Sequence, residues 1–327
     1  MKRIAINGFG RIGRSSLKVI FENEDIELVG INDLMSIENA VFLLQYDSVY
    51  GKYDKKITTQ GDLIIIDGKP IKYTSIKDPG ELPWKDLNVD VVIESTGIFT
   101  NKSDAEKHIT AGARFVVISG PTKDTPTVVH GVNTQEGKVS IFSCASCTTN
   151  NISPIIEILG RRIGIKKAIL NTTHAYTASQ SLVDGPSKKE PRMGRAAGIN
   201  LAPAATGAAI ATTKALPQYL SKFDGVAVRV PVAVGSISDI TFISERPTSV
   251  KEINDVLKEE SDSSRYREIV SVTDEPLVST DIRKSPFAAI VDLEMTRVVD
   301  GDLVKVMAWY DNEWGFTNQM IRQIQSL

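Results

Sequence analysis

The stretch that most constrains the fold is Gly8-Phe9-Gly10-Arg11-Ile12-Gly13, which directly follows a short apolar run from Arg3 to Asn7. This order predicts a buried strand, a tight turn and a helix that ends near Glu24. Glycines so placed let the backbone approach a pyrophosphate at a helix N-terminus. Asp33 stands 20 positions after the last glycine, where a carboxylate can accept hydrogen bonds from a ribose diol and would repel a 2′-phosphate. The pattern therefore predicts an NAD-binding unit, against the alternative of a plain turn and a solvated aspartate.

Length and composition limit the remaining possibilities. A chain of 327 residues exceeds one ordinary core and indicates about two domains. The net charge of -2 gives no electrostatic reason to expect a nucleic-acid or anionic-membrane partner. Two cysteines exclude a secreted disulfide framework and fit a reducing compartment. With no signal-like segment and no apolar run long enough to span a bilayer, we expect a cytoplasmic protein.

The first half of the chain continues with the elements of a parallel sheet. A second strand is expected at Ile26–Ile31, a helix at Ser36–Leu44, and an antiparallel hairpin around Asp67-Gly68. Continuous apolar runs at Val89–Glu94 and Phe115–Ile118 are typical of strands buried on both faces. Ligands of such sheets bind beyond the carboxyl ends of the strands. Candidate cofactor contacts are therefore Thr96, Gly97, Ser119 and Gly120, with ordinary loop residues as the alternative.

A cysteine stands where a helix should begin. The apolar run Val139–Phe142 predicts a strand, and the apolar spacing of Ile152, Ile155 and Leu159 predicts a helix that starts at Cys147. Free backbone N–H groups and the helix dipole stabilise a thiolate at such a position. Cys147 is therefore a candidate nucleophile, and a small buried apolar residue is the competing interpretation.

The second half of the chain has a different pattern of expected elements. A strand at Lys167–Thr173 ends at His174, and Gly185–Arg192 is typical of a long irregular loop. Strands then follow one another with few helices, which predicts an α+β domain with an antiparallel or mixed sheet. Expected strands are Gly225–Val230, Ser238–Ser244, Ala288–Val298 and Leu303–Tyr310, and expected helices are Ser249–Glu260 and Glu313–Ile324, the latter with Asn312 as its N-cap.

A cysteine nucleophile needs a base, and the chain has three histidines. His108 falls within an expected polar helix, His130 lies beside Gly131, and His174 ends a strand, which makes His174 the candidate. Taken alone, Cys147 and His174 also suggest a cysteine peptidase, but an upstream dinucleotide fold favours redox chemistry on a carbonyl. Cys144 and Cys147 form a C-x-x-C pattern without the second pair that a zinc site requires, so no metal is expected.

Six ordered motifs stand along the chain: Asn7–Arg14, Ala145–Asn150, His174–Thr177, Ala205–Ala209, Arg229–Pro231 and Trp309–Gly315. Together they resemble phosphorylating, NAD-dependent glyceraldehyde-3-phosphate dehydrogenase of the glycolytic type. The resemblance extends from end to end of the chain. It implies an α/β fold with a Rossmann dinucleotide-binding domain and a second α+β catalytic domain with a mostly antiparallel or mixed sheet.

The resemblance implies oxidative phosphorylation of glyceraldehyde 3-phosphate to 1,3-bisphosphoglycerate. Cys147, activated by His174, would form a hemithioacetal and then a thioester, and the backbone N–H of Cys147 with His174 would stabilise the oxyanion. Thr177, Ser179 and Arg229 match the family's substrate-phosphate positions. The positions that match its site for the attacking inorganic phosphate are Ser146, Thr148, Arg192, Thr206 and Gly207.

On the cofactor side, the resemblance places Asn312 on the nicotinamide carboxamide, with Phe316 near the ring. Pro186, with Asp33 and Leu34, resembles the NAD-preferring pattern. The full cofactor set that it implies is Gly8, Gly10, Arg11, Ile12, Gly13, Asp33, Leu34, Lys77, Thr96, Gly97, Ser119, Pro186, Asn312 and Phe316. It also implies an NAD domain of residues 1–146 plus 312–327, a catalytic domain of residues 147–311, and a homotetramer in which the loop around Pro186 reaches a neighbouring subunit.

Five positions depart from the family's pattern. Cys144 replaces a usual asparagine, Asn151 a frequent second cysteine, Phe316 a tyrosine, Ser179 an aspartate or threonine, and Lys77 a common arginine. We expect altered affinities rather than lost activity. Cys144 also raises the hypothesis that a disulfide with Cys147 protects an oxidised nucleophile, with a packed thiol as the alternative.

Two other functions stay open on the sequence. A close relative could oxidise erythrose 4-phosphate, although the motifs at His174–Thr177 and Gly185–Ser187 favour the glycolytic type. A non-catalytic NAD-binding or RNA-binding protein is the second alternative. Intact Cys147 and His174 argue against a loss of chemistry, and the charge balance gives RNA binding no support.

Overall fold

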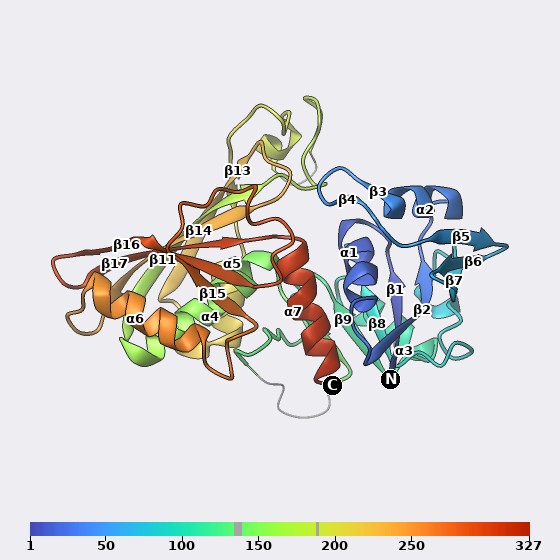
Figure 1. The fold of residues 1–327 in the computed structure, drawn as a ribbon, viewed down its shortest axis with the longest axis horizontal. Coiled ribbons are helices and arrows are strands. Elements are labelled where there is room, and N and C mark those ends of the chain that lie inside the picture. Colours follow the sequence, from blue (N-terminus) through green and yellow to red (C-terminus); the bar gives the residue numbers. More distant parts are fainter. Residues whose placement is uncertain (134–138, 188–189) are drawn as a thin grey trace. The chain divides into compact units, whose positions relative to one another are not determined.

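The computed structural model describes residues 1–133, 139–187 and 190–327 (Figure 1). The chain divides into two compact units. The first comprises Met1–Val128, Gln135–Ala145 and Met320–Leu327, and the second comprises Val129–Thr134 and Ser146–Gln319. The predicted α/β class with a Rossmann unit and a second mixed-sheet unit is confirmed. The functional boundaries expected near Cys147 and Asn312 stay a prediction.

The first unit is built on a largely parallel sheet. Among the described residues its strand order is β10-β9-β8-β1-β2-β7-β6-β5, with antiparallel pairing only between β7, β6 and β5. The central strands are buried because helices cover both faces, as their continuous apolar runs predict. The strands are β1 (Lys2–Asn7), β2 (Ile26–Asn32), β5 (Ile57–Gln60), β6 (Leu63–Ile66), β7 (Lys69–Thr74), β8 (Val91–Glu94), β9 (Phe115–Ile118) and β10 (Ile141–Ser143).

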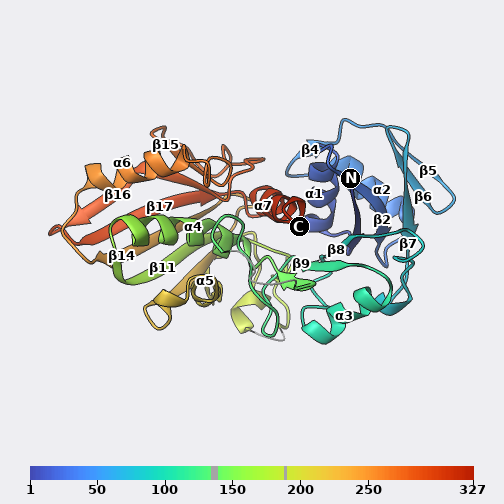
Figure 2. The same cartoon turned by 90° about the horizontal axis from the view of Figure 1, so that it is seen from below.

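Helices α1 (Arg11–Ile20) and α3 (Lys102–Thr110) lie on opposite faces of the central strands (Figure 2). The prediction that the first helix runs to Glu24 is wrong. The chain leaves the helix after Ile20 because the Asn23 amide donates to the carbonyl oxygen of Val19 at 2.7 Å and satisfies the helix end. Shorter elements complete the unit: α2 (Ile37–Gln45), β3 (Tyr46–Asp47), β4 (Gly51–Lys52) and a 3-10 turn, η1 (Pro79–Glu81).

The second unit has a mixed sheet, as expected. Its order among the described residues is β12-β13-β11-β14-β17-β16-β15, and only the pairs β11–β13 and β15–β16 are parallel. The strands are β11 (Ile165–Ala175), β12 (Ala202–Ala205), β13 (Phe223–Val230), β14 (Ser236–Ser244), β15 (Val270–Thr273), β16 (Ala289–Val299) and β17 (Leu303–Tyr310).

Helices α4 (Cys147–Arg162) and α6 (Val250–Ser261) pack against one face of this sheet, and α5 (Ala208–Ala215) packs beside α4 (Figures 1 and 2). Leu170, Thr172 and His174 alternate along β11 and are buried on the covered face. The period of two along a strand thus sends His174 toward α4.

Helix α7 (Trp314–Gln325) corrects a second local prediction. Asn312 is not its cap. The Asp311 carboxylate accepts hydrogen bonds from the backbone N–H groups of Glu313 at 2.9 Å and Trp314 at 2.8 Å. This leaves the Asn312 side chain available for another role.

The long loop after β11 is less irregular than expected. It contains a short 3-10 helix, η2 (Pro191–Gly194), and a second one, η3 (Pro217–Tyr219), follows α5. Residues 188–189 of the predicted loop lie outside the described residues. In the part of the chain that the structure describes, no helix is long and apolar enough to cross a membrane.

Candidate active site

The glycine turn after β1 has the shape that its sequence predicts. Gly8 has φ +94°, a left-handed conformation that side chains disfavour. A Cβ on Gly13 would lie 2.1 Å from the carbonyl oxygen of Gly8, so only glycine allows α1 to pack this close to the turn. Gly10, at the start of α1, has nothing within 4 Å of the position of its Cβ. The open space at the helix N-terminus fits a pyrophosphate.

Asp33 is tied to this turn through its carboxylate. One oxygen accepts from the backbone N–H of Phe9 at 2.6 Å and the other from that of Met35 at 2.9 Å. The carboxylate is thereby held at the wall of a cavity of about 650 Å³ within the first unit. The predicted cofactor residues that line this cavity are Gly8, Gly10, Asp33, Leu34, Lys77 and Thr96.

Other predicted cofactor residues lie outside the cavity wall. The Arg11 guanidinium forms an ion pair with the Asp47 carboxylate at 2.8 Å. Ile12 and Gly13 lie within the first turns of α1 and support the turn. Gly97 has φ +70° in the loop after β8, and the backbone N–H of Ser119 donates to the backbone carbonyl oxygen of Glu94.

Sequence reasoning missed several polar residues of this cavity. Asn7 and Asn32 end β1 and β2 and both line it, as do Asp78, Glu81 and Lys107. The rule that ligands bind at the carboxyl ends of parallel strands could have found the two asparagines. The lysine and the two acids come together only through the tertiary fold.

Cys147 is the first residue of α4, as predicted. Ser146 is the N-cap, and its hydroxyl accepts from the backbone N–H of Thr149 at 3.1 Å. The Sγ atom of Cys147 lies 3.4 Å from Nε2 of His174 at the end of β11. The structure therefore brings the predicted nucleophile and the predicted base into contact.

Arg229 lies beside the same imidazole. The parallel register of β11 and β13 pairs His174 with Arg229. Nδ1 of His174 is 2.7 Å from the carbonyl oxygen of Ala175 and 2.6 Å from Nη1 of Arg229. These two contacts require opposite tautomers, because Nδ1 would donate to the carbonyl and accept from the guanidinium. Nε of Arg229 is buried and has no hydrogen-bond partner among the described residues, which leaves a donor for an anion.

Burial controls the charge state of the pair. It raises the pKa of the Cys147 thiol, while the Arg229 charge and hydrogen bonds at the start of α4 act in the opposite direction. Burial, together with the Arg229 charge, lowers the pKa of His174 to about 4. The resting pair is therefore a thiol and a neutral imidazole, and the imidazole is free to take a proton.

Tyr310 packs beside the pair of Cys147 and His174, and the sequence alone did not predict it as a site residue. Its hydroxyl lies 2.9 Å from the hydroxyls of both Thr148 and Thr172, and its ring meets His174 edge-on at 6.0 Å. The Thr148 hydroxyl is thus engaged within the protein.

The residues expected to bind phosphate fall into two groups. Thr177 and Ser179 bring their hydroxyl oxygens to 2.9 Å from each other, just after β11. Thr206 and Gly207 stand at the start of α5, where the Thr206 hydroxyl accepts from the backbone N–H of Ala208 at 3.2 Å. Arg192 donates to the carbonyl oxygen of Pro203 at 3.5 Å, on the strand that leads to the second group.

The predicted nicotinamide residues have defined surroundings. Oδ1 of Asn312 accepts from the backbone N–H of Gly235 at 3.2 Å and from the Ser236 hydroxyl at 3.1 Å. These bonds fix the amide so that its N–H₂ group can donate to a carboxamide oxygen. Phe316 is buried, and Pro186 is exposed on the loop before η2.

Cys144 is buried and is not part of a disulfide. It follows β10, and its backbone N–H donates to Ile118 at 3.0 Å. Burial raises the pKa of Cys144 to about 12, so the thiolate that would attack an oxidised Cys147 is scarce. These surroundings favour the packed thiol over the disulfide hypothesis.

A glycine turn at a helix N-terminus, an aspartate held beside it and a thiol–imidazole pair are typical of an NAD-dependent oxidoreductase. Two family models match the chain: glyceraldehyde 3-phosphate dehydrogenase, NAD binding domain, over residues 2–102, and its C-terminal domain over residues 146–312. The chain belongs to the glyceraldehyde-3-phosphate dehydrogenase family, and its cofactor is NAD.

Curated relatives agree over nearly the whole chain. A glyceraldehyde-3-phosphate dehydrogenase of Thermotoga maritima is 46% identical, covering 100% of this chain and 99% of the relative. One from Zymomonas mobilis is 44% identical, covering 98% and 96%. Glyceraldehyde-3-phosphate dehydrogenase 1 of Candida glabrata is 42% identical, covering 99% and 98%.

Proposed function

We propose that this protein converts glyceraldehyde 3-phosphate and inorganic phosphate to 1,3-bisphosphoglycerate while NAD is reduced. The observation that carries the proposal is the 3.4 Å contact between Cys147 Sγ and His174 Nε2 at the start of α4, in a chain of this family. NAD, when bound, accepts the hydride.

Cys147 and His174 divide the first chemical steps between them. As the sulfur attacks the aldehyde carbon, Nε2 of His174 takes the thiol proton and returns it to the carbonyl oxygen, which gives a hemithioacetal. The imidazole then removes the hydroxyl proton while hydride leaves the same carbon, and a thioester remains on Cys147. The low pKa of His174 suits a base that must begin each of these steps uncharged.

Backbone and guanidinium groups would hold the substrate during these steps. The N–H of Cys147 at the helix start and the imidazole would stabilise the oxyanion. Arg229, Thr177 and Ser179 would bind the substrate phosphate. When Arg229 donates to that phosphate instead of to Nδ1, the imidazole can donate Nδ1–H to Ala175 and present the Nε2 lone pair to the sulfur.

A second anion site would serve the inorganic phosphate. Ser146, Thr148, Arg192, Thr206 and Gly207 supply backbone N–H groups, hydroxyls and one guanidinium, which suit a dianion. The phosphate oxygen attacks the thioester carbon, the C–S bond breaks, and the imidazolium returns its proton to the leaving thiolate. The free thiol is restored.

On the cofactor side, Asp33 would accept from the adenosine ribose and the turn from Gly8 to Gly13 would hold the pyrophosphate. Asn312 would donate to the nicotinamide carboxamide, with Phe316 and Pro186 as further contacts. Leu34, Lys77, Thr96, Gly97 and Ser119 would complete the cofactor site.

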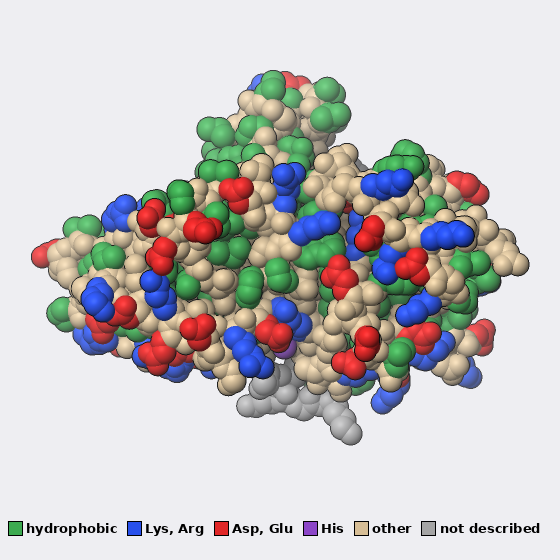
Figure 3. Space-filling view, viewed as in Figure 1, with side chains coloured by type: hydrophobic (Ala, Val, Ile, Leu, Met, Phe, Trp, Pro, Cys, Tyr) green, Lys and Arg blue, Asp and Glu red, His purple; other side chains and the backbone are tan. Residues whose placement is uncertain are grey.

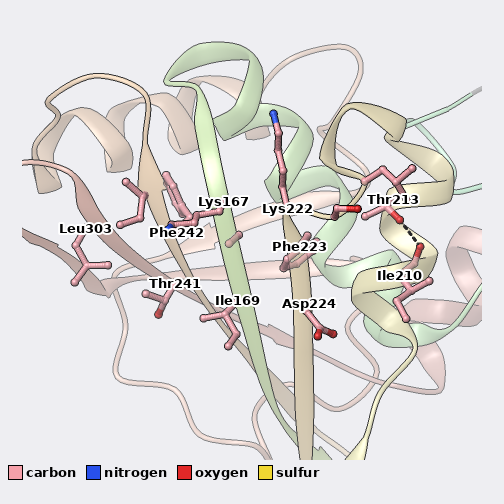
Figure 4. A pocket seen from close by; sticks show the side chains of 14 residues that line it. Lys167, Ile169, Ile210, Thr213, Lys222, Phe223, Asp224, Thr241, Phe242 and Leu303 are labelled. Atoms are coloured by element: carbon pink, nitrogen blue, oxygen red, sulfur yellow. Dashed lines mark hydrogen bonds between the residues drawn. The ribbon is translucent and has the colours of Figure 1, made fainter.

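Self-association is the assembly that the second unit supports best. The face of its sheet opposite α4 exposes apolar side chains, and Ile169 and Leu303 also line a cavity of the second unit (Figure 4). Ile169 is 59% exposed, and Val226 on the neighbouring strand is 53% exposed. A second copy of the chain would cover this face, in line with a homotetramer.

The surface charge does not favour a polyanionic partner such as a nucleic acid. Lysine and arginine side chains alternate with acidic ones over the face seen in Figure 3, and the net charge is -2. We infer a cytoplasmic enzyme that acts on small molecules, and the mixed surface charge is in line with this inference.

The decisive experiment follows NADH absorbance with glyceraldehyde 3-phosphate or erythrose 4-phosphate, with NAD or NADP, and with or without inorganic phosphate. We expect NADH formation to require glyceraldehyde 3-phosphate, NAD and phosphate together. Turnover of comparable rate without phosphate would contradict the phosphorylating assignment. Faster turnover of erythrose 4-phosphate would show that erythrose 4-phosphate, and not glyceraldehyde 3-phosphate, is the preferred substrate.

A further inference from the structure

A buried carboxylate lies beneath the cofactor cavity and is the meeting point of several hydrogen bonds. Glu94 ends β8 and is 2% exposed. Its Oε1 accepts from the backbone N–H of Thr96 at 2.8 Å and also from the Thr96 hydroxyl. Its Oε2 accepts from the Asn7 amide at 2.6 Å and lies 3.0 Å from Nε2 of His108.

The tautomer of His108 follows from its other neighbour. Nε1 of Trp84 lies 2.9 Å from Nδ1 of His108, and both side chains are fully buried. An indole N–H can only donate, so Nδ1 accepts and the imidazole proton sits on Nε2. His108 therefore donates to Glu94, and the carboxylate receives four hydrogen bonds.

The network continues across the carboxyl ends of β1 and β2. Oδ1 of Asn7 accepts from the amide of Asn32 at 2.7 Å. Oδ1 of Asn32 in turn accepts from the backbone N–H of Ile76 and from the hydroxyl of Thr74, each at 2.9 Å. At one end of this network the backbone N–H of Ile76 can only donate, and at the other end the Glu94 carboxylate can only accept, so the direction of the hydrogen bonds is determined. Every amide in between therefore points its donor toward Glu94.

This network forms part of the cavity wall. Asn7, Asn32, Ile76 and Thr96 line the cavity. The glycine turn also rests on it, because a Cβ on Gly8 would lie 2.5 Å from the backbone nitrogen of Thr96. The position of Thr96 therefore limits where the glycine turn can lie, even before the cofactor binds.

We propose that Glu94 and His108 are positioning residues for NAD, which hold Asn7, Thr96 and the glycine turn in the binding geometry through one directional hydrogen-bond network. Such preorganisation lowers the cost of ordering the site on binding. The proposal rests on NAD as the ligand. It concerns cofactor affinity, whereas the thiol chemistry takes place on residues of the other unit.

Glu94→Gln tests the direction of the network with little change in shape. An amide has one N–H₂ end, which must face either the Thr96 donors or those of Asn7 and His108. We expect the dissociation constant for NAD, measured by calorimetry without substrate, to rise at least about tenfold, the equivalent of roughly 1.4 kcal/mol. ADP-ribose should weaken by a similar factor, and kcat at saturating NAD should stay within about threefold of the wild type.

Glu106→Gln is the matched control. Glu106 lies on α3 with His108 but faces solvent, so the same charge is removed without touching the network. Its NAD affinity should equal that of the wild type. A folded Glu94→Gln protein that binds NAD as tightly as Glu106→Gln would overturn the proposal.

A measurement on the unaltered protein keeps the test independent of folding. Long-range ¹H–¹⁵N spectra should show the His108 proton on Nε2. A proton on Nδ1 would reverse the hydrogen-bond direction and sink the idea. Failure of the wild type to form NADH would instead contradict the proposed function and leave the binding comparison intact.

Discussion

Nε2 of His174 lies 3.4 Å from Sγ of Cys147, although 27 positions separate the two residues. The contact exists because α4 begins directly at Cys147 and packs on the face of the sheet toward which β11 directs His174. Neither element alone creates the pair.

Replacement of Arg229 by methionine should slow alkylation of Cys147 by iodoacetamide. The Arg229 charge counteracts the effect of burial on the pKa of Cys147, so its removal raises that pKa and leaves less thiolate. The pH profile of alkylation should move to higher pH than in the wild type. Cys147→Ser should give no labelling of the native protein, because Cys144 is buried. An unchanged pH profile would show that the Arg229 charge does not affect the pKa of Cys147.

Two glycines of the turn should respond differently to alanine. In Gly13→Ala the new Cβ would lie 2.1 Å from the carbonyl oxygen of Gly8, and we expect a large loss of stability, on the order of 3 kcal/mol. Gly10→Ala meets no atom within 4 Å, so its melting temperature should stay near that of the wild type. Its added methyl group enters the phosphate space and should weaken NAD binding. Equal melting temperatures for both variants would contradict this account.

Peroxide treatment should not produce a disulfide between Cys144 and Cys147. The raised pKa of Cys144, about 12, and its burial keep the resolving thiolate scarce. Mass spectrometry should find sulfenic and sulfinic acid on Cys147, and Cys144→Ala should be inactivated at the wild-type rate. A peptide that has lost two hydrogens, absent in Cys144→Ala, would restore the protective disulfide.

His174 should make stability depend on acid. Its pKa falls from 6.5 to about 4 on folding, so between these values the unfolded chain binds more protons than the native one. Stability should therefore be lost as the pH falls through this window, by up to about 3 kcal/mol. Denaturant titrations of His174→Gln should show a shallower loss over the same range. Parallel curves would assign the acid sensitivity to other groups.

Tyr310→Phe should test the support beneath the pair. The substitution removes the hydroxyl that bonds Thr148 and Thr172, at a cost of about 1–2 kcal/mol in stability. We expect kcat to fall roughly tenfold because His174 and the start of α4 lose a shared contact, while the dissociation constant for NAD stays unchanged. Tyr219→Phe, on a tyrosine outside this site, is the control. A wild-type kcat in Tyr310→Phe would limit the hydroxyl to a structural role.

The sequence by itself determined the parts that depend on local chemistry. The local sequence from the first strand to Asp33 predicts the backbone conformation of this segment, because only glycine tolerates the conformation of Gly8 and the contact at Gly13. The start of α4 at Cys147 also follows from the local capping of Ser146 and the apolar period that comes after it. Such features are fixed by neighbours in the chain.

Tertiary structure decided what depends on distant partners. His108 was expected on a polar helix, yet it is buried against Trp84 and Glu94. Asn312 was expected as a cap, yet Asp311 fills that role and leaves the Asn312 amide held by Ser236. A residue's type gives its donors and acceptors, but only the packing of separate elements decides which partners they meet and how far burial moves a pKa.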